Sequence, residues 1–175
     1  ARKCGFDNIN TDLIAGLPTD TPESFKNSLD SIVRLNAECI TVHTLCMKRA
    51  SRLTTEGVTL DLQQARDARE MLAYTQNILG QNEYIPYYMY RQSRMVGNLE
   101  NVGWSKRGFE SLYNVYVMDE THTILACGSG GVTKLKRNNP DYLERIFNFK
   151  YPYEYIDRFD ELIQRKSGIM QFYGQ

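Results

Sequence analysis

The stretch Asn10-Thr11-Asp12-Leu13-Ile14-Ala15-Gly16-Leu17-Pro18 decides the fold class of this chain. Residues 8–16 first alternate between polar and apolar side chains and then become continuously apolar. This pattern predicts a buried strand that ends at the Gly-Leu-Pro sequence. A helix is expected directly after it, because Thr21 can cap the helix, Pro22 suits its first position and apolar residues follow at helical spacing. Residues 39–45 are rich in β-branched side chains and predict a second strand. Strand, helix and strand in this order predict a right-handed parallel βαβ unit, and therefore an α/β fold.

The rest of the chain predicts further helices and short strands. After a polar loop expected over Lys48 to Val58, Asp61 and Gln64 form a capping-box pattern ahead of apolar residues at helical spacing. Aromatic and β-forming residues then take over. The expected elements are a helix from Asp61 to Gly80, strands over 84–91, 113–119 and 132–136, and helices opened by Asn139-Pro140 and by Pro152.

The composition excludes several classes of protein. With 42% hydrophobic residues, and 21 Lys+Arg against 21 Asp+Glu, the 175-residue chain can form a core and has a formal charge of zero. We expect no nucleic-acid partner, because binding to phosphate backbones usually needs a basic surface. We expect no membrane partner, because no apolar stretch approaches the ~20 residues that span a bilayer. The first residues carry neither an initiator Met nor a signal peptide, so the chain is expected to be cut from a longer one.

The cysteines and histidines predict no metal centre. The four cysteines stand far apart and form no CxxC pair: Cys4, Cys39, Cys46 and Cys127. Such usage is typical of reduced thiols, so we expect a cytoplasmic protein. His43 and His122 have no Cys, Asp or Glu at metal spacing, which favours a structural role for both.

Asp12 is the main candidate for ligand binding. It is an acidic residue in an otherwise apolar strand, near the carboxyl end, where α/β folds bind ligands. Its carboxylate can accept two hydrogen bonds from a ribose diol, or it can satisfy neighbouring backbone N–H groups. The run Gly128 to Gly131 allows the backbone to approach a ligand, or it forms a simple turn. Two further sets suit either binding or an ordinary packing and surface role: the tyrosines Tyr84, Tyr87, Tyr88 and Tyr90, and the cations Arg91, Lys106 and Arg107.

Several ordered motifs resemble one family. The opening stretch, followed by Thr21-Pro22-Glu23-Ser24-Phe25, is similar to the radical S-adenosylmethionine (radical SAM) enzymes of the oxygen-independent coproporphyrinogen III oxidase (dehydrogenase) family. The resemblance continues in later blocks: Ile40 to Leu45, Tyr90-Arg91-Gln92, Gly97 to Trp104, Tyr113-Asn114 and Gly128 to Gly131. It covers nearly the whole chain and corresponds to the carboxyl-terminal part of the family's chain.

The resemblance implies a fold and two cofactors. Family members fold as an incomplete (β/α)6 barrel, so we expect the carboxyl-terminal part of such a barrel, with added short strands and C-terminal helices. They hold a [4Fe-4S] cluster on a CxxxCxxC motif and bind S-adenosylmethionine at its open iron. That motif is absent from this chain, so the cluster ligands are not expected here. Residues 1–58 would form the βαβ portion of the barrel, 59–138 a helix and short mixed strands that close it, and 139–175 the C-terminal helices.

By position, the resemblance assigns four residues to the S-adenosylmethionine pocket. Asp12 matches the carboxylate that contacts the adenosyl ribose, and Ile14 lines the same pocket. Cys46 stands where the family has a small Ala whose backbone contacts S-adenosylmethionine, a departure that a backbone contact tolerates. Val132 matches an aliphatic residue near the adenine. The resemblance assigns no catalytic residue and no metal ligand to this chain.

The function implied by the resemblance is oxidative decarboxylation of coproporphyrinogen III propionates to vinyl groups, in haem biosynthesis, with a tetrapyrrole as the small-molecule partner. Because the cluster motif is absent, the chain is expected to be inactive alone. The alternatives are a haem chaperone or a methyltransferase of the same family, and a non-catalytic tetrapyrrole-binding module. An opened barrel exposes sheet edges, so self-association is also expected. The electron donor is not assigned.

Overall fold

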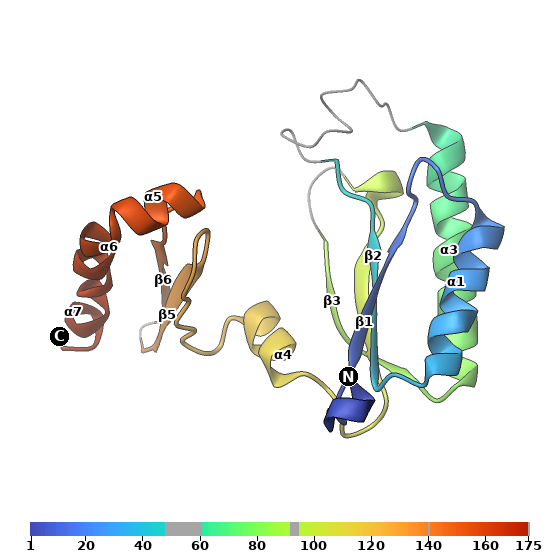
Figure 1. Ribbon diagram of the computed structural model, residues 1–175, viewed down its shortest axis with the longest axis horizontal. Helices are drawn as coiled ribbons and strands as arrows, with labels where there is room; N and C mark the ends of the chain where they lie inside the picture. The colour runs from blue at the N-terminus through green and yellow to red at the C-terminus, as the bar shows by residue number, and fades with distance from the viewer. Residues whose placement is uncertain (48–60, 92–94, 140, 175) are drawn as a thin grey trace. The chain divides into compact units, whose positions relative to one another are not determined.

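A computed structural model describes residues 1–47, 61–91, 95–139 and 141–174 (Figure 1). The polar loop expected over Lys48 to Val58 lies outside the described residues. The chain forms two compact units, Ala1–Ser111 and Leu112–Gln175. Each unit is described by itself below.

The βαβ unit predicted at the start of the first unit is confirmed. Strand β1 (Asn10–Ala15) pairs in parallel with β2 (Cys39–Thr44), and helix α1 (Pro22–Leu35) connects them. Thr21 caps α1 by accepting a hydrogen bond from the Ser24 N–H at 3.2 Å. The helix ends at Asn36, which has a left-handed φ of 60°. The capping residues Thr21 and Asn36 therefore set the two ends of α1.

Helix α3 (Leu62–Gln81) packs beside α1 on one face of the sheet (Figure 1). It begins with the predicted capping box, in which Asp61 and Gln64 each bond to the backbone N–H of the other. Two polar contacts join the helices. Lys26 Nζ lies 2.6 Å from Glu70 Oε1, and the Tyr74 hydroxyl donates to Asp30 Oδ1 at 2.7 Å. The first contact is exposed and the second is partly buried, with Tyr74 packed against the core, so the helix pair is joined from its surface to the edge of the core.

The sheet continues with two more strands, in the order β1-β2-β4-β3. Strand β3 (Ile85–Tyr90) was expected, whereas β4 (Asn101–Ser105) was not predicted. Strand β4 runs antiparallel to both β2 and β3, so β3 points in the same direction as β1 and β2. A bulge between Pro86 and Tyr88 changes the phase of β3. As a result Tyr84 lies in the helix-side core, while Tyr88 and Tyr90 contact the opposite face. The first unit also has short 3-10 helices, η1 (Arg2–Cys4) and η2 (Val96–Asn98).

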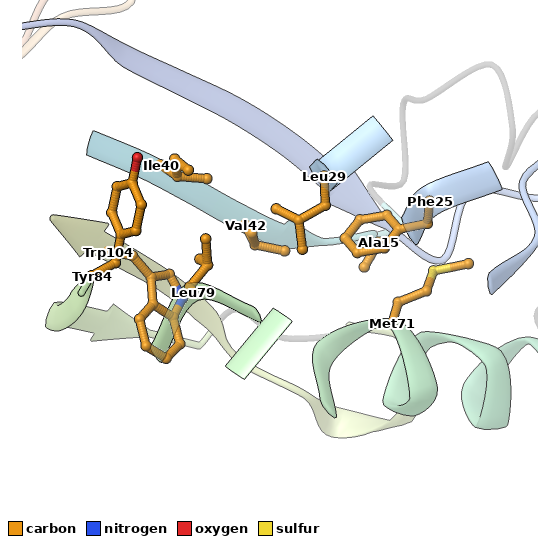
Figure 2. Packing of buried hydrophobic residues seen from close by; sticks show 9 residues of the cluster. All are labelled: Ala15, Phe25, Leu29, Ile40, Val42, Met71, Leu79, Tyr84 and Trp104. Carbon is orange, nitrogen blue, oxygen red and sulfur yellow. The ribbon is translucent and has the colours of Figure 1, made fainter. Parts of the chain in front are cut away.

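The core of the first unit lies between the sheet and the two helices (Figure 2). Alternate residues of the strands supply its sheet side, and α1 and α3 supply the other side. Its buried members are Ala15, Phe25, Leu29, Ile40, Val42, Met71, Leu79, Tyr84 and Trp104. The Tyr84 hydroxyl donates to the Ala37 carbonyl at 2.5 Å, which satisfies its polar end inside this core.

The second unit is a hairpin packed with short helices. Its elements are α4 (Leu112–Asp119), β5 (Val132–Asn138), β6 (Asp141–Phe147), α5 (Pro152–Asp157), α6 (Phe159–Lys166) and α7 (Gly168–Tyr173). Strands β5 and β6 pair antiparallel along their whole length. Leu135, Ile146 and Phe172 form the buried cluster that joins the hairpin to α7. The strand predicted over 132–136 and the helical character after Pro152 are confirmed.

Two predictions for the second unit are wrong. Residues 113–119, expected as a strand, form helix α4, and the helix expected after Asn139-Pro140 is strand β6. Runs this short are ambiguous between helix and strand, so tertiary partners decide. Helix α4 gains such a partner at its end, where Lys134 Nζ donates to the Val117 carbonyl at 3.1 Å. Strand β6 pairs with β5 from Asn138 and Asp141 outward, and this pairing outweighs the helical spacing of its apolar residues.

The structure is thus a mixed α/β fold, as predicted, with a sheet covered by helices in the first unit. Among the described residues, no helix combines the length and apolar character needed to traverse a bilayer.

Candidate functional site

The site residues lie on the face of the sheet opposite α1 and α3, called the open face below. Side chains alternate between the two faces of a strand, and the helix face takes residues such as Leu13, Ile40 and Val102. The open face therefore takes their neighbours: Asn10, Asp12, Ile14, Thr41, His43, Tyr88, Tyr90, Asn101 and Gly103. In the described part of the first unit, no helix packs on this face.

Asp12 stands in the third of the six positions of β1, not at the carboxyl end where it was expected. Its side chain is 58% exposed, so a ligand can reach it. Asn10 Nδ2 donates to Asp12 Oδ1 at 2.7 Å. Thr41 in turn donates its hydroxyl to Asn10 Oδ1 at 3.2 Å. One carboxylate oxygen is therefore held by an amide that β2 orients.

The second oxygen of Asp12 faces a histidine. His43 Nε2 lies 3.9 Å from Asp12 Oδ2, and the Tyr90 hydroxyl lies 3.2 Å from His43 Nδ1. Asn101 is the register partner of Tyr90, and its side-chain Oδ1 accepts from the Thr44 backbone N–H at 2.7 Å. These contacts join β3, β4, β2 and β1, so they form only when all four strands are in register.

Gly103 provides the space for Tyr88. A Cβ atom at position 103 would lie 1.8 Å from Tyr88 Cε1, so the ring occupies the place of a side chain on β4. Tyr88 reaches the Thr41 hydroxyl at 3.3 Å and stacks on Tyr90, with ring centroids 6.3 Å apart. Burial raises the pKa of Tyr88 and of Tyr90, and the nearby Asp12 carboxylate adds to this effect. Both phenols therefore keep their protons at neutral pH and can donate.

The structure places the four predicted pocket residues in different surroundings. Asp12 and Ile14 share the open face, two positions apart on β1, and Ile14 is 43% exposed. Cys46 follows β2, and its backbone forms an isolated bridge with Met95. Val132 belongs to the second unit, where it lines a cavity of about 530 Å³ together with Gly130 and Gly131. The structure thus brings Asp12 and Ile14 together, and the assignment of all four residues stays a prediction.

The glycine run beside Val132 is folded against its own unit. Gly130 N donates to the Phe149 carbonyl at 2.7 Å, and the Asn148 amide donates to the Gly128 carbonyl at 2.8 Å. A Cβ atom at Gly131 would lie 3.0 Å from the Cys127 carbonyl. Local packing thus already favours a residue without a side chain at position 131.

Sequence reasoning missed several residues of the open face. Asn10, Thr41 and Asn101 are polar residues in strands, and single-strand patterns do not reveal which of them meet across strands. His43 was assigned a structural role, yet it lies beside Asp12. The one available signal was His43 in a β-branched run, two positions after Thr41.

Two of the three predicted cations, Arg91 and Lys106, have partners of their own. Arg91 lies 2.6 Å from Glu100, and Lys106 bonds to Asn36 and lies over the Tyr84 ring. His122 contacts Thr121 and the Tyr116 ring. Within the described ranges, no group of three or more His, Cys, Asp or Glu side chains is arranged to hold a metal ion.

Comparisons with known proteins agree with this fold. No protein-family model matches the chain. The chain is 37% identical over 171 residues to the oxygen-independent coproporphyrinogen-III oxidase-like protein HemZ of Bacillus subtilis (strain 168), covering 98% of this chain and 34% of that protein. It is 29% identical over 147 residues to the heme chaperone HemW of Lactococcus lactis subsp. lactis (strain IL1403), covering 79% of this chain and 34% of that protein.

Among solved structures, the chain is similar to the coproporphyrinogen III oxidase HemN from Escherichia coli, a radical SAM enzyme, with a TM-score of 0.59 at 18% identity. The match covers 91% of this chain and 36% of that chain, and at this identity it supports the fold alone. The chain therefore spans about a third of the length of these relatives. Over almost its whole length, the chain is thus similar in sequence to about a third of the oxygen-independent coproporphyrinogen-III oxidase-like protein HemZ.

Proposed function

We propose that this chain forms one wall of the S-adenosylmethionine pocket of a radical SAM enzyme that oxidatively decarboxylates coproporphyrinogen III. Asp12 would accept hydrogen bonds from the adenosyl ribose, and Ile14 would pack beside it. Cys46 would contribute a backbone contact and Val132 an apolar contact near the adenine. The observation that supports this proposal best is the exposed Asp12 carboxylate, held by Asn10 on one oxygen and facing His43 on the other.

The residues of the open face suit a ribose diol. An ionised carboxylate has only acceptor sites, and two neighbouring hydroxyls can donate to it together. Asn10 is bonded to one oxygen only, and the Asp12 side chain is 58% exposed, so acceptor sites of the carboxylate remain for a ligand. Ile14, exposed on the same strand, offers an apolar surface next to these polar groups. Such a mixture of few polar groups and apolar surface is common in small-molecule sites.

The cluster does not fit this chain. A [4Fe-4S] cluster of this family needs three close thiolates, and the cysteines at positions 4, 39, 46 and 127 do not supply the CxxxCxxC spacing. The Cys39 thiol donates to the Phe109 carbonyl at 3.0 Å instead, and burial raises its pKa, which disfavours the thiolate that a metal binds. We therefore assign no cluster ligand and no electron-transfer step to these residues, and we expect the chain to lack this activity alone.

The test is the affinity for S-adenosylmethionine of the protein as its gene encodes it, measured by anaerobic titration calorimetry. Asp12→Ala removes both ribose contacts, so we expect affinity to fall about 10- to 100-fold, which corresponds to about 1.5–3 kcal/mol. Asp67→Ala is the matched control, because it removes a half-buried carboxylate on α3 and leaves the open face intact. Unchanged affinity in Asp12→Ala would contradict the assignment of Asp12.

A second candidate is haem binding without this chemistry, which the likeness to the heme chaperone HemW favours. We expect it to be the weaker candidate, because that likeness is 29% against 37% for HemZ. Haem titration followed by the Soret band separates the two. Tight haem binding by a protein that has no affinity for S-adenosylmethionine would replace the first proposal with the second.

A further inference from the structure

We propose that His43, held by Tyr90 in its Nε2–H tautomer, is a positioning residue that orients Asp12. The inference rests on the proposed function of Asp12 as the ribose acceptor. It adds a role for a histidine that the sequence pattern assigned to structure alone. The Thr44 backbone N–H can only donate, so it sets the orientation of the first side chain.

The first link fixes the amide of Asn101. This residue is 3% exposed, and its Oδ1 accepts from the Thr44 backbone N–H at 2.7 Å. A backbone N–H can only donate, so the oxygen of the amide must face β2. The other end of this amide is its NH2 group, a donor, and Tyr90 is the register partner of Asn101 on β3.

The second link fixes the hydroxyl of Tyr90. Burial is the main cause of the raised pKa of Tyr90, and the Tyr88 and Asp12 groups add to it, so the phenol keeps its proton. Its partner is His43 Nδ1, at 3.2 Å. The other ring nitrogen, Nε2, faces the Asp12 carboxylate, which can only accept, so the imidazole proton belongs on Nε2. The donor of the bond to Nδ1 is therefore the Tyr90 hydroxyl.

The third link fixes the imidazole. When Nδ1 accepts, the proton of the neutral ring is on Nε2, which faces Asp12 Oδ2 at 3.9 Å. This distance is longer than a hydrogen bond, so the interaction is the attraction between an N–H dipole and a carboxylate. The edge contact with the Tyr90 ring, at 6.4 Å between centroids, limits rotation of the imidazole.

The opposite oxygen of Asp12 is held by an equivalent chain. Asn10 donates to Oδ1 through Nδ2, so its own Oδ1 must accept from Thr41. The Thr41 proton is then in use, so the Tyr88 hydroxyl donates to Thr41. Asp12 thus has a hydrogen bond from Asn10 of β1 on one oxygen and the His43 imidazole of β2 beside the other. These two neighbours orient the carboxylate.

The first test reads the tautomer directly and does not depend on S-adenosylmethionine. We expect the 15N chemical shifts of histidine-labelled protein at pH 8, where imidazole is normally neutral, to show the Nε2–H form at His43. Tyr90→Phe removes the donor to Nδ1 and should produce a mixture of tautomers. Tyr74→Phe is the matched control, because it removes a phenol hydrogen bond on the helix side. An Nδ1–H form in the wild-type protein, or the same tautomer in Tyr90→Phe, overturns the proposal.

The second test reads the consequence for binding. His43→Ala should weaken S-adenosylmethionine binding about 5- to 10-fold, and His43→Gln should restore most of it, because its amide can place an N–H near the position of Nε2. Rescue by Gln supports positioning, since a merely structural ring would not be replaced by an amide. If Asp12→Ala weakens binding while His43→Ala does not, the positioning role is wrong and the proposed function stands. If Asp12→Ala itself has no effect, the proposed function is wrong and the positioning role falls with it.

Discussion

Gly103 is the residue on which the arrangement of the open face depends. Because it has no Cβ, the Tyr88 ring crosses β4 and reaches Thr41, which holds Asn10 and through it Asp12. The backbone of Gly103 does not have a left-handed φ, so glycine is required here for space and not for conformation. The space at Gly103 thus allows a series of hydrogen bonds that runs from Tyr88 through Thr41 and Asn10 to Asp12.

We expect Gly103→Ala to lower the free energy of unfolding by about 1–3 kcal/mol, because the ring must leave its place. Tyr88→Ala in the same protein should recover part of that loss by removing the clash, which a double-mutant cycle in urea measures. Gly80→Ala is the matched control. Position 80 lies in α3 with open space around it, so alanine should add about 0.5–1 kcal/mol. Equal stability of Gly103→Ala and wild type would show that Tyr88 moves without cost.

The sequence predicted Asp12 and Ile14 as neighbours but not the residues that hold them. Residues two positions apart on one strand lie on the same face of the sheet. The sequence of one strand was therefore enough to place Asp12 and Ile14 together. The contacts with Thr41, Tyr88 and Asn101 depend on the pairing of β2, β4 and β3, and on a bulge that shifts β3. No local pattern encodes such a register, because it results from packing of the whole sheet.

The two helices with a cap at their start were predictable, whereas some of the shorter elements that depend on tertiary partners were not. Helices α1 and α3 begin at the capping residues that the sequence displays. Strand β4 was missed because Asn101 and Gly103 are poor strand formers, although Val102 and Trp104 alternate with them. Helix α4 was predicted as a strand and strand β6 as a helix. Both segments are short, and contacts with β5 decide their structure.

Glu38, between α1 and β2, ties the start of the chain to the sheet. Its carboxylate accepts from the Ile9 N–H at 3.0 Å and from Arg2 at 2.8 Å. Burial of Glu38 by itself raises the pKa, but the bonds from Arg2 and Ile9 outweigh it and hold the pKa below the ordinary value. A lowered folded-state pKa means that the ionised form stabilises the fold. That stabilisation is complete above the ordinary Glu pKa, about 4.3, and is lost as pH falls through the lower folded value.

We therefore expect Glu38→Gln to lower stability by about 1 kcal/mol at pH 7, and to reduce the loss of stability on acidification. Urea unfolding at a series of pH values checks both effects. Glu70→Gln breaks the exposed pair with Lys26 and should change stability by less than about 0.5 kcal/mol. An identical pH dependence of the Glu38→Gln and wild-type proteins would rule out this role.

At the scale of the whole molecule, the sheet has two edges. Among the described residues, β1 pairs with β2 and lies at one end of the order β1-β2-β4-β3, and β3 lies at the other end. An unpaired strand edge is a template for another chain. We expect the 175-residue chain to self-associate, with a mass by light scattering that rises with concentration. Met89→Lys adds a charge to β3, so association that weakens in this variant involves the β3 edge. A monodisperse monomer would contradict the prediction.

The position of Trp104 gives the molecule a built-in optical probe. The chain has one tryptophan, and it is buried in the core of the first unit, between the sheet and α3. Its emission therefore reports the unfolding of Ala1–Ser111, whereas far-ultraviolet circular dichroism reports both units. Coincident curves from the two signals mean that the units unfold as one cooperative block. Separate curves mean that the second unit, which contains Val132, unfolds independently of the first unit, which contains Asp12.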